Sequence, residues 1–396
     1  MRPPQGWSVL WEDPSMTVAR TDQRYAYISN LAVPDSKFPV SGQIDGPINS
    51  YLGGACILRS TDFGKTFSVS ASDCLSNNGQ FYDGGSMVSD AHGAIYAAFV
   101  NADLNTIEVW RAPTETAPFV RLADPLVNGG PISTHPRLRY DVWTDRVYVM
   151  AQGATSPVLN ELLNNFPTIS HFDAVGQLLM DYYENGAWHG AQVVASDALL
   201  YPVIPLDTSD PFGFVRVGPQ FNFDVGDPSV NQDDAVRVAY TARRNDGTRA
   251  VKAVRCTRNL SCLATPEWST TTLYGNQWNP DVRTQLSFLT VPTVWKMSYT
   301  STAGQTAMHV AGKQGTLAVI GTGTRTFLEF AMGDPNRTVC PDKRGYWGDY
   351  DIMDVLSASL QTGAVTFFRA RSSSESACNY RWQFTSDPLH VDGVIF

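Results

Sequence analysis

The sequence has few charged residues, no basic cluster and no long apolar run. Charged residues make up 17% of the 396 positions, below the ~25% of average globular domains, and the net charge is −9. Because phosphate binding needs a basic face, we do not expect nucleic acid to be a main partner. The longest apolar runs resemble Ala94–Val100 and fall well short of the ~20 residues that cross a bilayer, so no membrane span is predicted.

Helical periodicity is almost absent too. Runs of β-branched and aromatic residues alternate instead with Gly, Asn, Asp and Pro, which is typical of strands and turns. One phrase recurs along the chain: a polar residue with Pro or Gly, an apolar pair, a turn, and then an apolar strand that ends in aromatic residues. Its copies begin at Asp13, Asp83, His135, Asp227, Asn279 and Gly348. We therefore expect an all-β protein built from repeats.

The spacing of this phrase predicts the architecture. The copies lie about 67 residues apart on average, which suits a four-stranded propeller blade of roughly 40 to 50 residues plus its loops. We expect residues 1–396 to form one six-bladed β-propeller domain, with a seven-bladed ring as the alternative. The longest interval leaves room for a seventh blade or for a long insertion around residues 196–218. The strand Trp7–Trp11 is expected to close the ring by joining the last blade.

The six cysteines indicate an oxidising compartment. None has the Cys-x2-Cys spacing of a zinc site, and each has a partner nearby in the sequence. The expected disulfides are Cys56 with Cys74, Cys256 with Cys262, and Cys340 with Cys378, although six cysteines allow other pairings and reduced core thiols are the alternative. The tripeptides Asn259-Leu260-Ser261 and Asn336-Arg337-Thr338 fit the glycosylation sequon. Together these features favour a secreted or cell-surface protein.

One short motif has a clear structural meaning. The segment Ser60–Phe67 reads Ser-Thr-Asp-Phe-Gly-Lys-Thr-Phe, which matches the Ser-x-Asp-x-Gly-x-Thr-Trp/Phe Asp-box. We expect Asp62 to accept hydrogen bonds from the backbone of its own turn and Gly64 to supply a positive φ. With this motif and the repeated phrase, the chain resembles the sialidase-like Asp-box β-propeller superfamily. The segment Tyr346–Tyr350 is similar to a Trp-Gly-Asp-Tyr phrase of its secreted bacterial members.

The resemblance implies catalytic residues of the sialidase type. Tyr350 falls where the family has its nucleophilic tyrosine, Asp227 where it has the partner carboxylate, and Arg243 near the place of an arginine that binds the substrate carboxylate. A carboxylate beside a phenol can act as its base. The segment Asn279–Arg283 has Asp281 at the position where another such arginine is expected.

The polar residues at the starts of the repeated strands predict a ligand site. If these strands line a central channel, their side chains meet there, and the sugar hydroxyls of a glycan would suit them. The expected ligand-binding residues are Asp13, Asp83, His135, Arg137, Asn279, Asp281, Arg283, Asp349 and Asp351. Such an acidic ring could also hold Ca²⁺, although no contiguous calcium loop is present.

Three functions remain open at this point. The first is a protein that binds or hydrolyses extracellular glycans, and the second is a non-catalytic module for a protein partner or surface assembly. The third is a polysaccharide lyase, which would use His135, His171 or His189 with Arg137 to abstract a proton beside a uronate. Whether the protein is an enzyme is left undecided by the sequence.

Overall fold

The computed structural model describes most of the first two thirds of the chain and scattered strands after that. The described ranges are 4–9, 14–35, 53–76, 82–101, 103–126, 136–153, 175–199, 203–205, 214–216, 221–226, 236–243, 249–265, 276–285, 293–302, 305–314, 324–332, 344–346, 352–357, 362–369 and 390–395. Side chains are described no further than Leu263. The protein is all-β, and it divides into two compact units, Met1–Leu159 with Gln177–Val193 and Asn160–Gly176 with Val194–Phe396.

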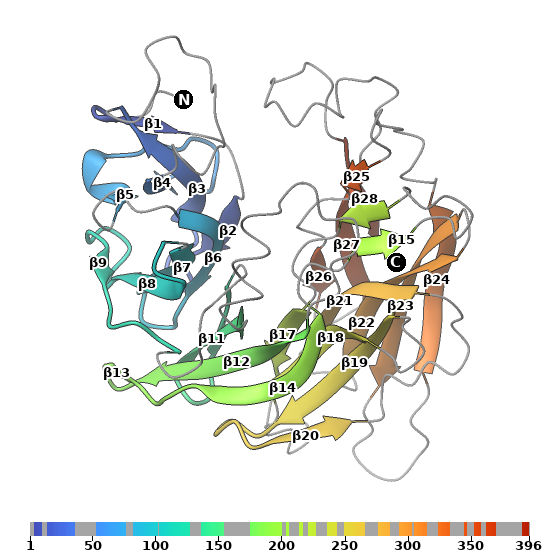
Figure 1. Ribbon diagram of the computed structural model, residues 1–396. Coiled ribbons are helices and arrows are strands. Elements are labelled where there is room, and N and C mark those ends of the chain that lie inside the picture. Colours follow the sequence, from blue (N-terminus) through green and yellow to red (C-terminus); the bar gives the residue numbers. More distant parts are fainter. Residues whose placement is uncertain are drawn as a thin grey trace. The chain divides into compact units, whose positions relative to one another are not determined.

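The first sheet of unit 1 has five antiparallel strands (Figure 1). They are β1 (Trp7–Val9), β2 (Ser15–Val18), β3 (Ala26–Pro34), β4 (Gly54–Ser60) and β5 (Cys74–Leu75). The order is β1-β3-β4-β5, with β2 paired to another part of β3. The prediction that the Trp7–Trp11 strand joins the last blade is therefore wrong: Trp7 pairs with Pro34 of the first sheet. The sequence of a strand does not by itself determine which strand it pairs with, because pairing depends on how the strands pack.

Two further sheets complete unit 1. The second runs in the order β6-β7-β8-β9, and the third is the part of a nine-stranded sheet that begins in the order β10-β11-β12, with β13 paired to β12. Their strands are β6 (Tyr82–Ser89), β7 (Ile95–Asn101), β8 (Thr106–Ala112), β9 (Val120–Arg121), β10 (Arg137–Asp141), β11 (Arg146–Gly153), β12 (Val175–Glu184) and β13 (Ala187–Trp188). Each is the up-and-down arrangement that the alternating strands and turns predict.

Serine side chains of the repeated phrase join neighbouring sheets. Ser15 Oγ of β2 accepts a hydrogen bond from Met87 N of β6 at 3.0 Å, and Ser86 Oγ of β6 accepts one from Leu138 N of β10 at 2.9 Å. The strands that begin three successive copies of the phrase therefore lie next to one another. That these strands form the inner strand of each repeat stays a prediction.

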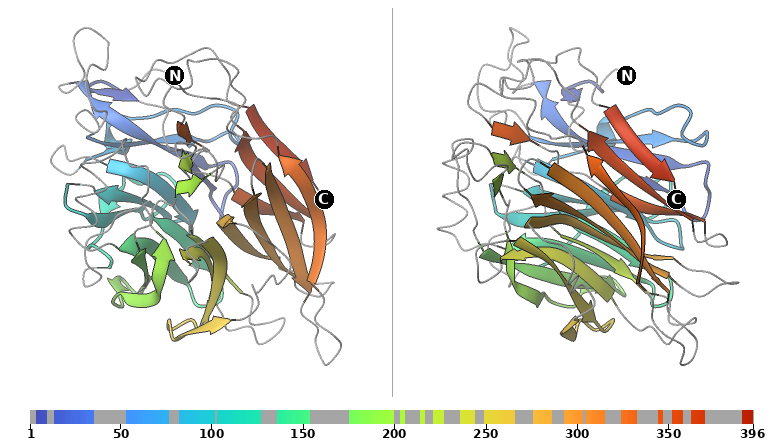
Figure 2. Two further views of the ribbon diagram at one scale, coloured as in Figure 1. Left: turned by 45° about the vertical axis from the view of Figure 1, so that its right-hand side comes forward. Right: turned by 90° about the vertical axis from the view of Figure 1, so that its right-hand side faces the viewer.

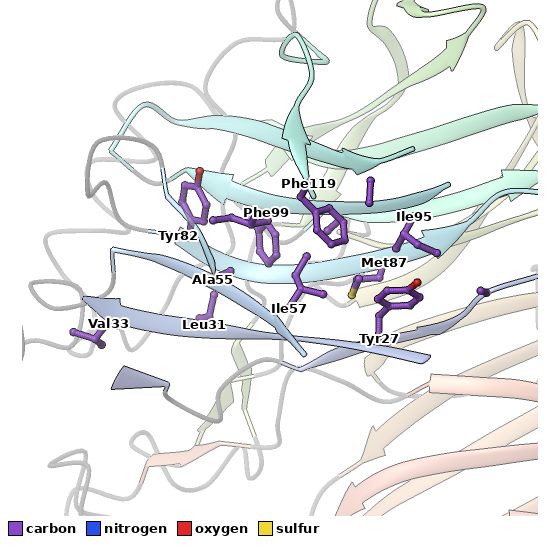
Figure 3. Packing of buried hydrophobic residues seen from close by; sticks show 14 residues of the cluster. Tyr27, Leu31, Val33, Ala55, Ile57, Tyr82, Met87, Ile95, Phe99 and Phe119 are labelled. Carbon is purple, nitrogen blue, oxygen red and sulfur yellow. The ribbon is translucent and has the colours of Figure 1, made fainter. Parts of the chain in front are cut away.

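The core between the first two sheets is apolar and closely packed (Figure 3). Tyr27 of β3 and Ile57 of β4 lie in one cluster with Met87 of β6 and Phe99 of β7, and all four are almost fully buried. Burial of one such side chain contributes ~1.5–3 kcal/mol. Alternate residues of these strands supply the cluster, as the period of two in a strand requires.

Unit 2 contains the remaining strands. One group pairs β18 with β17 and β19, and β19 with β20, while Ala198 of β14 also pairs with β18. These are β14 (Gln192–Leu199), β17 (Phe221–Val225), β18 (Val236–Arg243), β19 (Arg249–Cys256) and β20 (Cys262–Thr265). The four strands β21 (Asn276–Gln285), β22 (Thr293–Thr302), β23 (Gln305–Gln314) and β24 (Thr324–Met332) form a meander (Figure 2).

Two smaller sheets lie in the same unit. One contains β15 (Val203–Pro205), β16 (Phe214–Arg216) and β25 (Arg344–Tyr346), and the other contains β26 (Ile352–Ser357), β27 (Thr362–Arg369) and β28 (His390–Ile395). The pairing of β16 with β25 is parallel and joins segments far apart in the sequence. The segment 203–216 thus contains two short strands within the range expected to hold an insertion.

Two of the three expected disulfides are present. Cys56 of β4 is bonded to Cys74 of β5, and Cys256 of β19 is bonded to Cys262 of β20. In each case the two cysteines are cross-strand partners, which explains how residues that are near in the sequence meet. Cys340 and Cys378 lie outside the described residues. The two bonds are compatible with an extracellular location.

Candidate functional site

The structure describes few of the side chains of the predicted ligand ring. Asp13, His135, Asp227, Asp349, Tyr350 and Asp351 are outside the described residues. Only the backbone is described for Arg243, at the end of β18, and for Asn279, Asp281 and Arg283, in β21. The catalytic roles of Tyr350, Asp227 and Arg243 therefore stay predictions.

Two residues of the predicted ring have described side chains. Asp83 of β6 is half-buried, and its Oδ1 accepts a hydrogen bond from Gly84 N at 2.8 Å within a β-bulge. Arg137 begins the adjacent strand β10 and is 9% exposed. The structure thus brings Asp83 and Arg137 to neighbouring strands, and their ligand role remains a prediction.

The turn after β4 has the hydrogen bonds that its motif predicts. Asp62 Oδ1 accepts from Thr66 N at 2.8 Å, its Oδ2 accepts from Thr66 Oγ1 at 2.7 Å, and Ser60 Oγ accepts from Gly64 N at 2.9 Å. Gly64 has a φ of 76° and Phe63 one of 63°. The bonds from Thr66 and Ser60 lower the pKa of Asp62 to about 2. Asp62 is therefore a structural residue of this turn.

The turn between β10 and β11 presents a tryptophan on a fixed backbone. Trp143 and its neighbour Val142 are each 47% exposed. Beneath them, Asp141 is 1% exposed, and its carboxylate accepts hydrogen bonds from Trp143 N at 3.0 Å and from Thr144 Oγ1 at 2.6 Å. Because the buried carboxylate holds the turn, the tryptophan is presented in a preorganised position.

Asp145 of the same turn pairs with a histidine of another turn. Asp145, at a φ of 55°, accepts a hydrogen bond from Tyr140 Oη at 2.8 Å, and its Oδ2 lies 3.0 Å from His92 Nε2 of the turn between β6 and β7. The side chains of His92 and Asp145 are 69% and 57% exposed. We call the group of Trp143, Asp145 and His92 the Trp143 surface.

A second polar cluster includes Arg146, the residue that follows Asp145. Arg146 of β11 donates from Nε to Glu184 of β12 at 2.8 Å, and its guanidinium lies 4.4 Å from the ring centre of Tyr182. The ring of His189 stacks on Tyr182 at 4.4 Å, and His189 Nε2 lies 3.3 Å from Glu184. We call these four residues the Tyr182 cluster. Although burial opposes the charge, the hydrogen bonds with Glu184 and Tyr148 raise the pKa of Arg146.

The buried carboxylate of Asp181 fixes the backbone that carries the Tyr182 cluster. Asp181 is 1% exposed, and its Oδ1 accepts hydrogen bonds from Tyr182 N at 2.7 Å, from Gly190 N at 2.9 Å and from His189 N at 3.2 Å. Burial raises the pKa of Asp181, and these N–H groups partly offset that rise. Asp181 therefore fixes the backbone conformation at Tyr182 and His189.

The tyrosines that meet carboxylates here are hydrogen-bond donors. Three such pairs are Tyr82 with Glu108, Tyr140 with Asp145, and Tyr240 with Asp197. Burial, followed by the neighbouring carboxylate, raises the pKa of each phenol, to about 12 for Tyr140. A nucleophilic tyrosine needs the opposite shift or an acting base. Each phenol has a carboxylate within reach, but all three side chains are almost fully buried, so these pairs support the fold and are poor candidates for nucleophiles.

Sequence reasoning missed the Trp143 surface and most of the Tyr182 cluster. Three turns share one signal: Asp22, Asp90 and Asp141 each accept a hydrogen bond from the N–H two residues later. A search for aspartates just after each repeated strand would have found the turn that carries Trp143. The Asn185-Gly186 pair, both with positive φ, likewise marks the hairpin between β12 and β13 beside which the Tyr182 cluster lies.

Within the described residues there is no group of three or more His, Cys, Asp and Glu that could hold a metal ion. The calcium prediction rests on residues whose side chains are mostly not among those described, and it stays a prediction. Among the same residues, no helix is long and apolar enough to span a membrane.

Comparisons with known proteins show only distant similarity. No protein-family model and no curated protein matches the sequence. Among solved structures, the six-bladed β-propeller lectin of Aleuria aurantia has 9% identity and a TM-score of 0.44, over 90% of this chain and 87% of that one. An α-L-arabinofuranosidase of Fusarium graminearum has 10% identity and a TM-score of 0.44, over 91% and 88% of the two chains. An α-L-arabinanase of Penicillium chrysogenum has 8% identity and a TM-score of 0.41, over 72% and 76%.

Proposed function

We propose that the protein binds a glycan and that the Trp143 surface contacts it. The observation that carries the proposal is an exposed tryptophan, whose backbone a buried aspartate fixes, in the same turn as Asp145 of the exposed His92–Asp145 pair. A sugar ring has an apolar face that stacks on an indole and hydroxyls that both donate and accept hydrogen bonds. Asp145 can accept from such hydroxyls, and His92 can donate or accept according to its tautomer.

The geometry supports binding more directly than hydrolysis. Asp145 and His92 are more than half exposed, whereas catalytic acids and bases usually work where water is excluded. Tyr82, Tyr140 and Tyr240, which pair with carboxylates, are almost fully buried and so are not placed to attack a bound glycan. Hydrolysis of the sialidase type would depend on Tyr350, Asp227 and Arg243 and is the alternative within the same substrate class.

Binding is tested first with a glycan array and then by titration of each glycan that binds. The variant is Trp143→Ala, and the matched control is Val142→Ala, an equally exposed residue of the same turn. We expect Trp143→Ala to weaken binding at least tenfold because one aromatic stacking contact is lost, and Val142→Ala to change it less than twofold. A silent array, or equal binding by both variants, would contradict the proposal.

Hydrolysis is tested separately with a panel of fluorogenic glycosides, including sialosides. Turnover that Tyr350→Phe abolishes would establish the sialidase-type mechanism. No turnover, or turnover that the substitution does not alter, would exclude it and leave binding as the function. A protein that binds no glycan but captures a protein ligand would be the non-catalytic module instead.

A uronate lyase is the second candidate. His189, Tyr182 and Arg146 lie together, and this group has the base, the phenol and the positive charge that abstraction of a proton beside a carboxylate requires. The test is incubation with polyuronates, where the unsaturated product absorbs ultraviolet light. His189→Ala should abolish the signal, and a lack of signal from the unmodified protein would rule the lyase out.

The proposed setting is a single six-bladed propeller, secreted or at the cell surface, with seven blades as the alternative. Three successive sheets of unit 1 support it, because their first strands adjoin through Ser15 and Ser86. The two disulfides support the location. An experimental structure would count the blades directly.

A further inference from the structure

The hairpin between β19 and β20 has a glycosylation sequon at its tip. Asn259-Leu260-Ser261 lies inside the loop that the Cys256–Cys262 disulfide closes. An Asn-x-Ser/Thr tripeptide is common by chance, so its surroundings decide whether it matters. The proposed glycan-binding function does not use this hairpin.

The tip is rigid and turns Asn259 outward. Leu260 N donates to Thr257 O at 2.8 Å, and Thr257 N donates to Ser261 O at 2.9 Å. The two neighbours of Asn259 are anchored in the protein: Arg258 is 5% exposed and donates to Gly226 O at 2.6 Å, and Leu260 is 5% exposed. Asn259 itself is exposed. An oligosaccharide on its amide would therefore extend into solvent without displacing the hairpin.

Strand β20, which follows the sequon, indicates what such an oligosaccharide would do. Strand β20 ends the strand order of its sheet, and in the described part of the chain no further strand pairs with it. Leu263, in β20, is 75% exposed, the largest value among the exposed large apolar side chains described. A bare edge strand with an exposed apolar residue promotes pairing between molecules. A bulky hydrophilic group four residues away would oppose that pairing.

We propose that Asn259 is an acceptor for an N-linked oligosaccharide and that this oligosaccharide shields the β20 edge. The Asn259 side-chain nitrogen forms a bond to C1 of the first sugar, and the bond from C1 to the diphosphate of a lipid-linked donor breaks. The lipid diphosphate leaves with the electron pair, and the amide proton is released to a base. The modification needs passage through a secretory compartment, so it rests on the proposed location and not on glycan binding.

Secretion from a eukaryotic host tests the modification. The full chain is expressed as Asn336→Gln, so that the second sequon cannot contribute, and the peptide that carries residue 259 is analysed by mass spectrometry. We expect a hexose-containing mass increase that peptide-N-glycosidase removes with conversion of Asn259 to aspartate. Asn259→Gln and Ser261→Ala should each abolish the increase, and Ser261→Thr should retain it. An unmodified Asn259 in secreted, disulfide-bonded protein would overturn the proposal.

Aggregation of the folded protein tests the shielding. Light scattering at raised concentration is compared for the glycosylated protein, Asn259→Gln, and Asn259→Gln with Leu263→Lys. We expect faster aggregation for Asn259→Gln, by severalfold, and recovery in the double variant because a charge on the edge strand also prevents pairing. Equal aggregation with and without the oligosaccharide would overturn the shielding role even where Asn259 is modified.

Discussion

Two hairpin tips of this protein are fixed by different means. The tip between β10 and β11 is held by the buried carboxylate of Asp141, and the tip between β19 and β20 by the Cys256–Cys262 disulfide. The first presents Trp143, and the second presents Asn259. A carboxylate orders the backbone of the folded state, whereas a disulfide mainly restricts the unfolded chain. Loss of the first should therefore change the geometry of its tip, and loss of the second chiefly the stability.

Removal of the carboxylate should have the largest effect. In Asp141→Ala, the N–H of Trp143 and the hydroxyl of Thr144 lose their acceptor, and we expect a loss of about 3 kcal/mol in the free energy of unfolding. Denaturant unfolding measures this loss. Glycan affinity, measured on the folded variant, should fall as well because Trp143 is no longer preorganised.

The matched control is Thr144→Val, which leaves the bond from Trp143 N to Asp141 in place. It should cost about 1 kcal/mol and leave glycan affinity nearly unchanged. If Asp141→Ala lost no more stability than Thr144→Val, the buried carboxylate would not be what holds this tip.

Removal of the disulfide should cost less and should not alter binding. For a loop with a sequence separation of 6, the chain-entropy model gives about 2 kcal/mol for the replacement of both cysteines by serine. Unfolding of Cys256→Ser with Cys262→Ser, compared with the unmodified protein, measures it. Unchanged glycan affinity is expected because the Trp143 surface lies in unit 1, and reduced affinity would show that the two tips are not independent.

The two tips also differ in what could be predicted from sequence. The disulfide followed from two cysteines six residues apart, because a tight hairpin is the simplest way for them to meet. Asp141 has a weaker signature, since an aspartate after a repeated strand marks the turn but only burial makes this carboxylate important. The Tyr182 cluster depends on register: Val147 pairs with Tyr183, which brings Arg146 and Glu184 together. Strand register is set by packing, so pattern alone did not reveal it.

The fold likewise has features that the sequence predicts and features that it does not. The repeated phrase falls on β2, β6 and β10, one strand in each sheet of unit 1, because alternation and turn residues are local properties. The partner of Trp7–Trp11 was predicted wrongly, since several sheets offer an edge and the sequence does not rank them. The positions of the predicted ligand residues relative to one another depend on how the repeats assemble, so the pattern within one repeat could not predict them.

The prediction with the smallest expected effect compares Asp62, a more exposed carboxylate, with the buried Asp141. Asp62 holds its turn as Asp141 does, but in a more exposed place, and its pKa is lowered from 3.8 to about 2. A lowered folded-state pKa stabilises the protein above the unfolded value near 4, and this contribution is lost as the pH falls toward 2. Thermal unfolding from pH 6 to pH 2 should therefore show a smaller loss in Asp62→Asn than in the unmodified protein. Parallel curves for the two proteins would mean that the hydrogen bonds to Asp62 do not favour its charged form, and that only burial makes a carboxylate in these turns energetically important.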